Sequence, residues 1–141
     1  MEPDWAPSHV RNFLKLVQTG WLNGTEFHRI IKAFMVQGGM AQGRTSGPTH
    51  NADRWVHKVK GEFSKDLKHM RGMVSMARND DPDSAATSFF LMLGDSPHLD
   101  GQYSLFARIV EGLEVLDAFE KEELDGEKPK RRIELIEATI D

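Results

Sequence analysis

The segment from Phe27 to Gly39, FHRIIKAFMVQGG, constrains the fold more than any other stretch of the chain. Most of its residues are β-branched, aromatic or otherwise apolar, a composition that favours largely buried strands. Two polar side chains, Arg29 and Gln37, interrupt the apolar run. A guanidinium in such surroundings costs free energy unless it finds hydrogen-bond partners or opens onto a cleft. The segment therefore predicts two short strands joined by a turn, with fixed hydrogen-bond donors along the wall of a groove.

The rest of the chain predicts further short strands and two helices. Apolar side chains three and four residues apart predict one helix from Pro7 to Gly20 and another around Leu116. Further strands are expected over residues 72–78, 89–93, 103–110 and 132–140, and a short helical turn is expected after Ser64. Apolar residues lie on both sides of the last strand, which predicts that both of its faces are covered. These elements indicate a mainly β fold built on an antiparallel sheet.

Composition argues against several classes of protein. The 141 residues carry 22 acidic and 18 basic side chains, and this net charge of −4 argues against a nucleic-acid or anionic-membrane partner. No apolar run approaches the length of a membrane-spanning helix. The chain has no cysteine, and its six histidines show no metal-ligand spacing, so we expect no disulfide, no metal and no cofactor. The length is enough for a single domain, which we expect to span residues 1–141.

The segment 27–39 resembles the signature of the cyclophilins, the cyclosporin-sensitive peptidyl-prolyl cis–trans isomerases. Three later segments follow in the order and spacing of that family: LKHMRGMVSMAR (67–78), SFF (88–90) and HLDGQYSLFARIVEG (98–112). The resemblance extends from about Trp5 to the C-terminus. It implies the cyclophilin fold, an antiparallel β-barrel with a helix over each open end. It also implies an enzyme that accelerates X–Pro isomerisation in peptides and folding proteins without a cofactor.

One departure from the family concerns the N-terminus. Cyclophilins normally begin with two strands before the first helix, whereas only six residues precede Pro7 here. The resemblance therefore implies a barrel that is incomplete at its N-terminus, with exposed strand edges that pair with other chains. Three explanations remain open: a truncated product, a gap filled by another copy in a homo-oligomer, or a gap that is tolerated because the groove residues lie downstream. The compartment is not specified, and we take the cytoplasm as the default because any export signal would precede the missing hairpin.

The chemistry that this family performs needs no nucleophile. The barrier to rotation about a peptide bond is roughly 18–20 kcal/mol and arises from amide resonance. A catalyst must therefore prefer the twisted amide, whose prolyl nitrogen is pyramidal and accepts a hydrogen bond. Arg29 resembles the catalytic arginine of the family, which donates toward that nitrogen. One preorganised donor supplies about 3–4 kcal/mol, or two to three decades in rate.

The resemblance also implies a set of substrate-binding residues. Phe34, Met35, Phe90 and Leu99 match the proline pocket of the family, Gln37 matches a glutamine that bonds the substrate backbone, and Ala77 and Arg78 match the strand edge along which the substrate pairs. Tyr103 occupies a position where histidine or tyrosine is usual. Phe89, which precedes the pocket phenylalanine, and Phe106 are expected to be core residues.

Three positions in this set differ from the usual residue. Arg78 replaces an asparagine, and we expect the change to be tolerated because the contact there is largely through backbone. Ser88 replaces a glutamine, which shortens the reach into the groove. His98 replaces the tryptophan of members that bind cyclosporin tightly, so we expect weak cyclosporin binding.

The residues alone also allow other interpretations. Without the surrounding motif, Arg29 would be interpreted as a structural ion-pair partner of a carboxylate; Gln37 is as well suited to a hydrogen bond between loops as to a contact with substrate. At the level of function, the rivals of an active isomerase are a proline-peptide-binding module with little turnover and an assembly protein whose open edge pairs with a partner chain.

Overall fold

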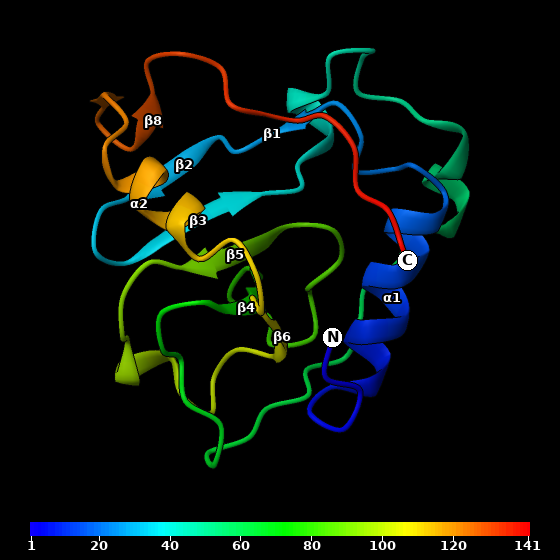
Figure 1. Ribbon diagram of the computed structural model, residues 1–141. Coiled ribbons are helices and arrows are strands. Elements are labelled where there is room, and N and C mark those ends of the chain that lie inside the picture. Colours follow the sequence, from blue (N-terminus) through cyan, green and yellow to red (C-terminus); the bar gives the residue numbers. More distant parts are fainter.

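The computed structural model describes residues 1–141 and consists mainly of short antiparallel strands (Figure 1). The main sheet contains, in spatial order, β2 (Arg29–Ile31), β3 (Met35–Gly38), β5 (Phe89–Met92), β4 (Met73–Met76) and β6 (Leu105–Arg108). Two further pairs are β1 (Thr25–Glu26) with β9 (Glu134–Leu135) and β7 (Leu124–Asp125) with β8 (Lys128–Pro129). The helices are α1 (Pro7–Gln18), α2 (Glu114–Glu120) and three 3₁₀ segments, η1 (Ala41–Gly43), η2 (Asn51–Trp55) and η3 (Pro97–Leu99). None of the helices has the length and apolar character needed to cross a bilayer.

The strand pairing does not close into a ring. The β2 edge of the main sheet is bridged to the C-terminal part of the chain, because the Ile30 amide donates to the Glu127 carbonyl at 2.7 Å. The opposite edge, β6, receives only one backbone bond from outside the sheet, from the Glu2 amide to the Phe106 carbonyl at 2.9 Å. The structure is therefore a curved antiparallel sheet with one largely open edge.

The two faces of the main sheet carry different side chains, as the two-residue period of a strand requires. On the first face, Ile30 of β2 and Val36 of β3 pack with α2, and Phe89 of β5 packs with α1. On the other face, Met35 and Phe90 belong to a separate apolar cluster. One face therefore builds the core, and the other is free to form a site.

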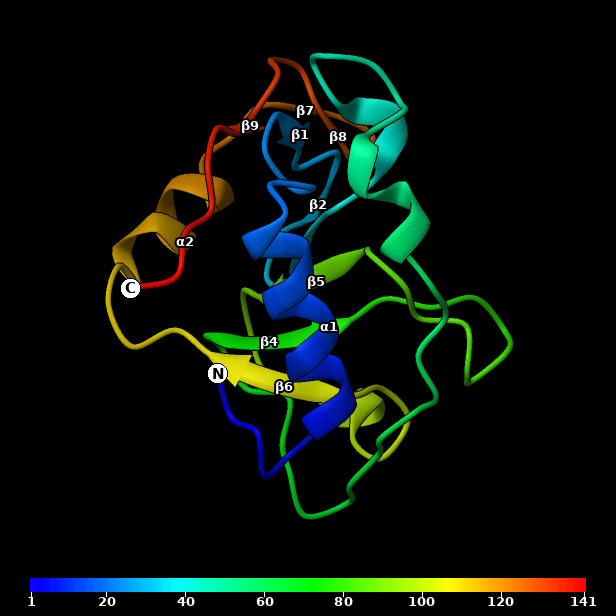
Figure 2. The same cartoon turned by 90° about the vertical axis from the view of Figure 1, so that its right-hand side faces the viewer.

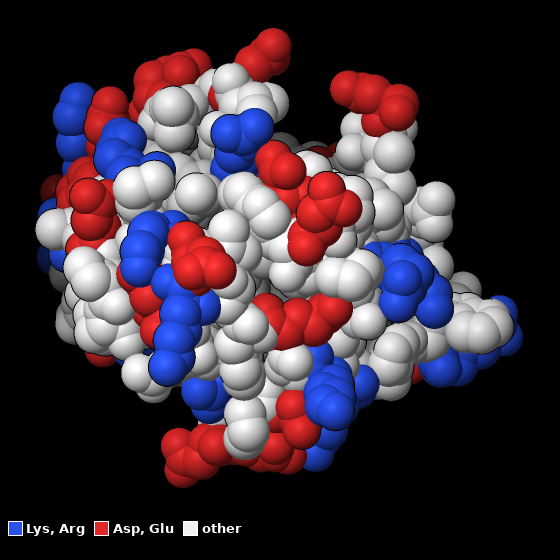
Figure 3. Space-filling model, turned by 90° about the horizontal axis from the view of Figure 1, so that it is seen from below, with Lys and Arg blue, Asp and Glu red and all other residues white.

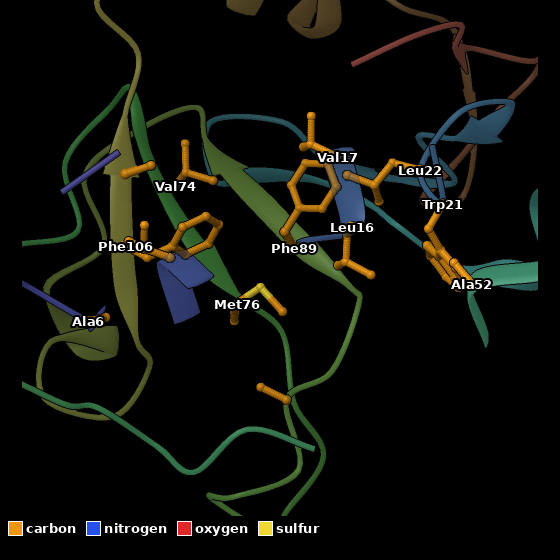
Figure 4. Close-up of a cluster of buried hydrophobic side chains, with 13 residues drawn as sticks. Ala6, Leu16, Val17, Trp21, Leu22, Ala52, Val74, Met76, Phe89 and Phe106 are labelled. Carbon is orange, nitrogen blue, oxygen red and sulfur yellow. The ribbon is translucent and has the colours of Figure 1, made fainter. Parts of the chain in front are cut away.

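Both α-helices cover the core face. Phe13 of α1 contacts the rings of Phe89 and Phe106 at centroid distances of 5.3 and 5.1 Å. Figure 4 shows side chains of β4, β5 and β6 turned toward those of α1, and Figure 2 shows α1 running across these strands. In α2, Leu116 and Phe119 are buried in the second cluster. Phe89 and Phe106 are 4% and 0% exposed, which confirms the prediction that they are core residues.

The start of α1 is fixed by a distant carboxylate. The residue before the helix, Ala6, has no side chain that can cap it. Glu62 instead accepts hydrogen bonds from the backbone amides of Ser8 and His9, at 3.2 and 2.9 Å, and from Nδ1 of the buried His9 ring at 2.6 Å. Burial raises the pKa of Glu62, but the hydrogen bonds from His9 and Ser8 outweigh it and lower the pKa below its usual range. The carboxylate therefore joins the loop before β4 to α1.

Several sequence predictions are confirmed in shortened form. The segment 27–39 forms two antiparallel strands, β2 and β3, joined by a turn, and α1 begins at Pro7 as expected. The strands predicted at 72–78, 89–93 and 103–110 are β4, β5 and β6. Each is one to four residues shorter than predicted.

Two predictions about local structure are wrong. No helical turn follows Ser64; its hydroxyl accepts a single bond from the Asp66 amide at 3.2 Å. The strand expected over 132–140 is only β9, and its two faces are not both covered, since Ile136 is 77% exposed. The segment 120–130 is charged and mostly exposed, and it also contains the β7–β8 hairpin, which lacks the apolar alternation that would have indicated strands.

Candidate functional site

A cavity of about 350 Å³ opens on the face of the main sheet that the helices leave free. Its ten lining residues are Arg29, Phe34, Met35, Gln37, Ala77, Arg78, Phe90, His98, Leu99 and Tyr103. All ten belong to the eleven site residues expected from the sequence; the eleventh, Ser88, does not line the cavity. Residues from four separate parts of the chain therefore meet in one place.

The hairpin of β2 and β3 sets the positions of the two polar side chains. Arg29 and Gln37 are cross-strand partners, so both side chains emerge on the same face. The turn between the strands contains Ala33 at φ 64°, a left-handed conformation that is uncommon for a residue with a side chain. The Ala33 amide donates to the Glu120 carboxylate of α2 at 2.7 Å, which holds the turn in place. The next residue, Phe34, is thereby directed into the cavity.

Arg29 is restrained from two sides. Its Nε donates to Glu127 at 2.7 Å, and its Nη1 donates to the Gln37 side-chain oxygen at 3.3 Å. The structural ion pair that the sequence analysis gave as an alternative role for Arg29 therefore exists. It engages only the Nε–H of the guanidinium. Nη2 has no partner within the chain, and the side chain remains 44% exposed at the cavity. The arrangement presents a fixed positive charge with spare N–H groups to whatever enters.

Gln37 is itself held by Ser88. The Gln37 amide nitrogen donates to the Ser88 hydroxyl at 2.9 Å, and that hydroxyl donates to the Gly38 carbonyl at 3.0 Å. Both ends of the Gln37 amide therefore have partners within the protein. Ser88 lies behind the cavity and positions Gln37.

The apolar wall is a cluster of four buried side chains. Met35, Phe90, Met92 and Leu99 are each at most 7% exposed. Phe90 meets the Tyr103 ring edge to face at 5.9 Å. At the rim, the rings of Phe34 and His98 lie 5.6 Å apart. The wall is rigid and apolar, and it can accept a small aliphatic ring.

Arg78 occupies another part of the rim. Its guanidinium carbon lies 4.6 Å from the centre of the Tyr103 ring and 5.7 Å from that of Phe63. Its Nε and Nη2 both donate to the Gln102 carbonyl, at 3.1 and 2.8 Å. The sequence analysis predicted a backbone contact with substrate at Arg78 but no role for Phe63. Phe63 lies in a loop, and no strand pattern in the sequence indicates its position.

A buried hydrogen-bond network of His69, Asp100 and Ser75, which we call the His69 relay, lies beside Phe90. The sequence analysis did not predict it. His69 is 2% exposed; its Nδ1 lies 3.0 Å from Asp100, and its Nε2 lies 3.1 Å from the Ser75 hydroxyl. Ser75 is the cross-strand partner of Phe90, and the His69 ring stacks on the Phe90 ring at 6.4 Å. The relay therefore connects β4, the strand that pairs with β5 at Phe90, to Asp100. Asp100 directly follows His98 and Leu99 of the cavity wall.

Burial lowers the pKa of His69, and it outweighs the hydrogen bond and the charge of Asp100, which raise that pKa. A neutral ring also fits the hydrogen bonds. Nδ1–H donates to Asp100, and the Ser75 hydroxyl lies within hydrogen-bond distance of two acceptors, Nε2 at 3.1 Å and the Ser104 carbonyl at 3.0 Å. The relay holds the wall and the floor of the cavity together while His69 is neutral.

Other hollows in the molecule lack this combination of groups. A larger one, of about 520 Å³, is lined by Ala118 of α2 and by charged residues of the segment 121–131. It offers almost no apolar wall. No group of three or more His, Asp or Glu side chains lies close enough together to hold a metal ion.

Comparison with known proteins gives one consistent family. The model of the family described as cyclophilin type peptidyl-prolyl cis-trans isomerase/CLD matches residues 1–140. Peptidyl-prolyl cis-trans isomerase CYP18-1 of Arabidopsis thaliana is 41% identical over 139 residues, which cover 97% of this chain and 84% of that protein. Peptidyl-prolyl cis-trans isomerase-like 3 of Gallus gallus is 44% identical over 117 residues, 82% of this chain and 70% of that protein.

A solved structure matches as well. The crystal structure of a cyclophilin type peptidyl-prolyl cis-trans isomerase of Cryptosporidium parvum, in the presence of the dipeptide Ala-Pro, superposes with a TM-score of 0.85 at 30% identity. The match covers 99% of this chain and 88% of that one. The cyclophilin-like fold expected from the sequence is confirmed by this match.

The His69 relay predicts a dependence of stability on pH. Because folding lowers the pKa of His69 from its ordinary value of about 6.5, the unfolded chain binds the proton first on acidification. The free energy of unfolding should therefore hold above about pH 6.5 and fall as the pH drops below it toward the lowered pKa. Urea denaturation at pH 7.5 and pH 5 measures this fall. His69→Gln should reduce it, leaving the part due to His28, whose pKa burial also lowers.

His57→Gln is the matched control, because His57 is exposed. It should leave the pH dependence unchanged. An equal fall in the wild type and in His69→Gln would contradict the role given to His69.

Proposed function

The chain belongs to the cyclophilin-type peptidyl-prolyl cis–trans isomerases, and we propose that the cavity beside Arg29 binds the X–Pro bond and isomerises it. Members of this family bind proline-containing peptides. The observation that carries the assignment of the site is the single guanidinium held against an apolar pocket. The pocket suits the prolyl ring, and the guanidinium suits the nitrogen of that same ring.

The catalytic step is a rotation in which no covalent bond forms or breaks. As the amide twists, its nitrogen loses resonance with the carbonyl and regains a lone pair that accepts a hydrogen bond. The free Nη2 of Arg29 is the donor that we assign to this lone pair. The interaction strengthens only in the twisted state, so it lowers the barrier rather than merely tightening binding. Glu127 and Gln37 hold the guanidinium before the substrate arrives, which avoids a cost of reorganisation.

The backbone of the substrate has a partner in the segment after β4. The amide and the carbonyl of Arg78, which point to the same side of an extended backbone, have no hydrogen-bond partner within the chain. An extended peptide that pairs with them adds a short strand segment at the rim of the cavity. With the proline in the apolar pocket and the backbone fixed here, the two sides of the X–Pro bond are gripped separately. Rotation of one side against the other then becomes the motion that the site favours.

Arg29→Ala should abolish most of the activity. The loss of one preorganised donor predicts a fall in kcat/KM of roughly 10²–10³-fold for an Xaa-Pro peptide in a coupled isomerisation assay. Arg71→Ala is a matched control, because Arg71 also forms an ion pair, with Asp117 at 2.7 Å, but lies outside the cavity. It should retain activity near that of the wild type. A wild type that binds the peptide without accelerating isomerisation would favour the binding-module alternative, and full activity in Arg29→Ala would contradict the assignment of Arg29.

We propose weak binding of cyclosporin at the same cavity. His98 stands at the rim against Phe34, where it offers a smaller ring than the tryptophan of tight-binding members. His98→Trp should therefore tighten cyclosporin binding, measured by isothermal titration, through additional buried ring surface. A wild type that binds as tightly as the tryptophan variant would refute this proposal.

We propose no nucleic-acid or membrane partner. The net charge is −4, and Figure 3 shows acidic and basic side chains interspersed over the face that it presents. A basic surface stripe is what nucleic-acid binding requires.

A second copy of the chain is the partner that we propose for the open edge of the sheet. The outer side of β6 receives a single backbone bond, and Val110, just beyond the strand, is 80% exposed. Exposed edges with apolar neighbours pair readily. Sedimentation velocity should show a concentration-dependent dimer that Val110→Glu weakens, whereas Met70→Glu, at another exposed apolar side chain, should not weaken it. A monomer over the whole concentration range would count against self-association.

A further inference from the structure

We propose that Arg78 makes this enzyme prefer substrates with an acidic side chain within two residues of the proline. The inference rests on the proposed function, since it concerns the substrate class of the same cavity. It goes beyond the expected backbone contact at position 78, because it assigns a role to the side chain.

The charge of Arg78 is the one at the cavity that no carboxylate neutralises. The other cation, Arg29, is paired with Glu127 at 2.7 Å. Arg78 forms no ion pair, and its hydrogen bonds go to two backbone carbonyls, those of Gln102 and Asn79. Carbonyl oxygens satisfy N–H groups but leave the net charge in place. An acidic ligand would therefore find an uncompensated cation at the rim.

The carboxylates of the neighbouring loop are engaged elsewhere. Asp83 accepts the Gly61 amide at 2.8 Å, and Asp81 accepts the Asp83 amide at 2.9 Å. These bonds hold both side chains in their own loop. Asp80 is exposed and forms no ion pair with Arg78. The negative charges of this loop therefore reduce the positive potential at the rim, but they form no ion pair with the guanidinium of Arg78.

The guanidinium is also fixed before the substrate binds. It lies over the rings of Tyr103 and Phe63, at 4.6 and 5.7 Å from their centres, and two of its nitrogens donate to the Gln102 carbonyl. A guanidinium has five N–H groups, and three of its nitrogens each use one here, so two N–H groups remain for a ligand. Since the side chain is already restrained, a new ion pair costs little further conformational entropy.

Backbone pairing brings the substrate side chain within reach. If the peptide pairs with the free amide and the free carbonyl of Arg78, a substrate residue lies directly across from Arg78. The Cβ atoms of such cross-strand pairs are roughly 5 Å apart, and side chains of opposite charge at these positions attract each other. Because the pair is partly exposed, the preference should be modest, about two- to fivefold.

The simpler alternative is that Arg78 only closes one side of the cavity. Its stacking on Phe63 and Tyr103 serves that purpose equally well for a neutral substrate. The two roles differ in one measurable respect: packing has no dependence on the charge of the substrate, whereas selection does.

The test compares kcat/KM for Xaa-Pro peptides that carry Glu, Gln or Lys at each position within two residues of the proline. For the wild type, Glu should exceed Gln by about two- to fivefold at one position, and the ratio should shrink at 1 M salt, where the screening length is about 3 Å. Arg78→Gln should bring the ratio to one, Arg78→Lys should retain part of it, and Arg78→Glu should reverse it in favour of Lys. The ratio within one variant is informative even if the variant is less active overall.

Arg11→Gln is the control for net charge. Arg11 is exposed on α1, outside the cavity, and its loss should leave the Glu-to-Gln ratio unchanged. Turnover of the neutral peptide by the wild type without any charge preference would overturn this inference and leave the proposed function standing. An Arg78→Gln variant that keeps the preference would also overturn it. If the wild type turned over none of the peptides, the proposed function would fall, and this inference with it.

Discussion

The antiparallel pairing of β3 with β2 and β5 is the constraint on which the candidate site depends. In this register Arg29 lies across from Gln37, and Gln37 lies across from Phe90. The donor, the residue that holds it and the pocket floor therefore emerge on one face, while Ile30 and Val36 enter the core on the other. A shift of one residue would exchange the two faces and bury the guanidinium. The core and the site are thus two consequences of the same set of hydrogen bonds.

Rigid supports behind the cavity explain how its groups remain in place. Glu120 of α2 bonds the turn at Ala33, Ser88 bonds Gln37, and Asp100 bonds His69 beneath Phe90. Each bond joins segments distant in sequence. Catalysis by a preorganised donor requires this, because a guanidinium that had to reorient during the rotation would lose most of its advantage. His69 is the member of this set that responds to acid. Burial lowers its pKa, so the ring is neutral above that lowered pKa and takes up a proton below it.

The main strands and the cavity residues could be predicted from the sequence, because their patterns are local. The apolar run containing Arg29 and Gln37 indicates a hairpin with a polar wall, and the resemblance to cyclophilins supplies the remaining lining residues. Phe63 and the relay of His69, Asp100 and Ser75 could not be predicted, because loops without a repeating pattern bring them to the site. The prediction for the segment after Arg132 was wrong for a different reason. Apolar residues on both sides of a strand indicate cover only if neighbouring elements supply it, and Ile136 remains exposed.

The central claim is that Arg29 contributes to the rotation itself rather than to binding. Two-dimensional NMR exchange on a proline peptide with substoichiometric protein measures cis–trans interconversion and, from line widths, binding in the same sample. The account predicts strong exchange cross-peaks with the wild type. With Arg29→Ala it predicts line broadening from binding but exchange near the uncatalysed rate. Loss of binding and exchange together, in a variant that remains folded, would show that Arg29 acts as a binding residue and would contradict the account.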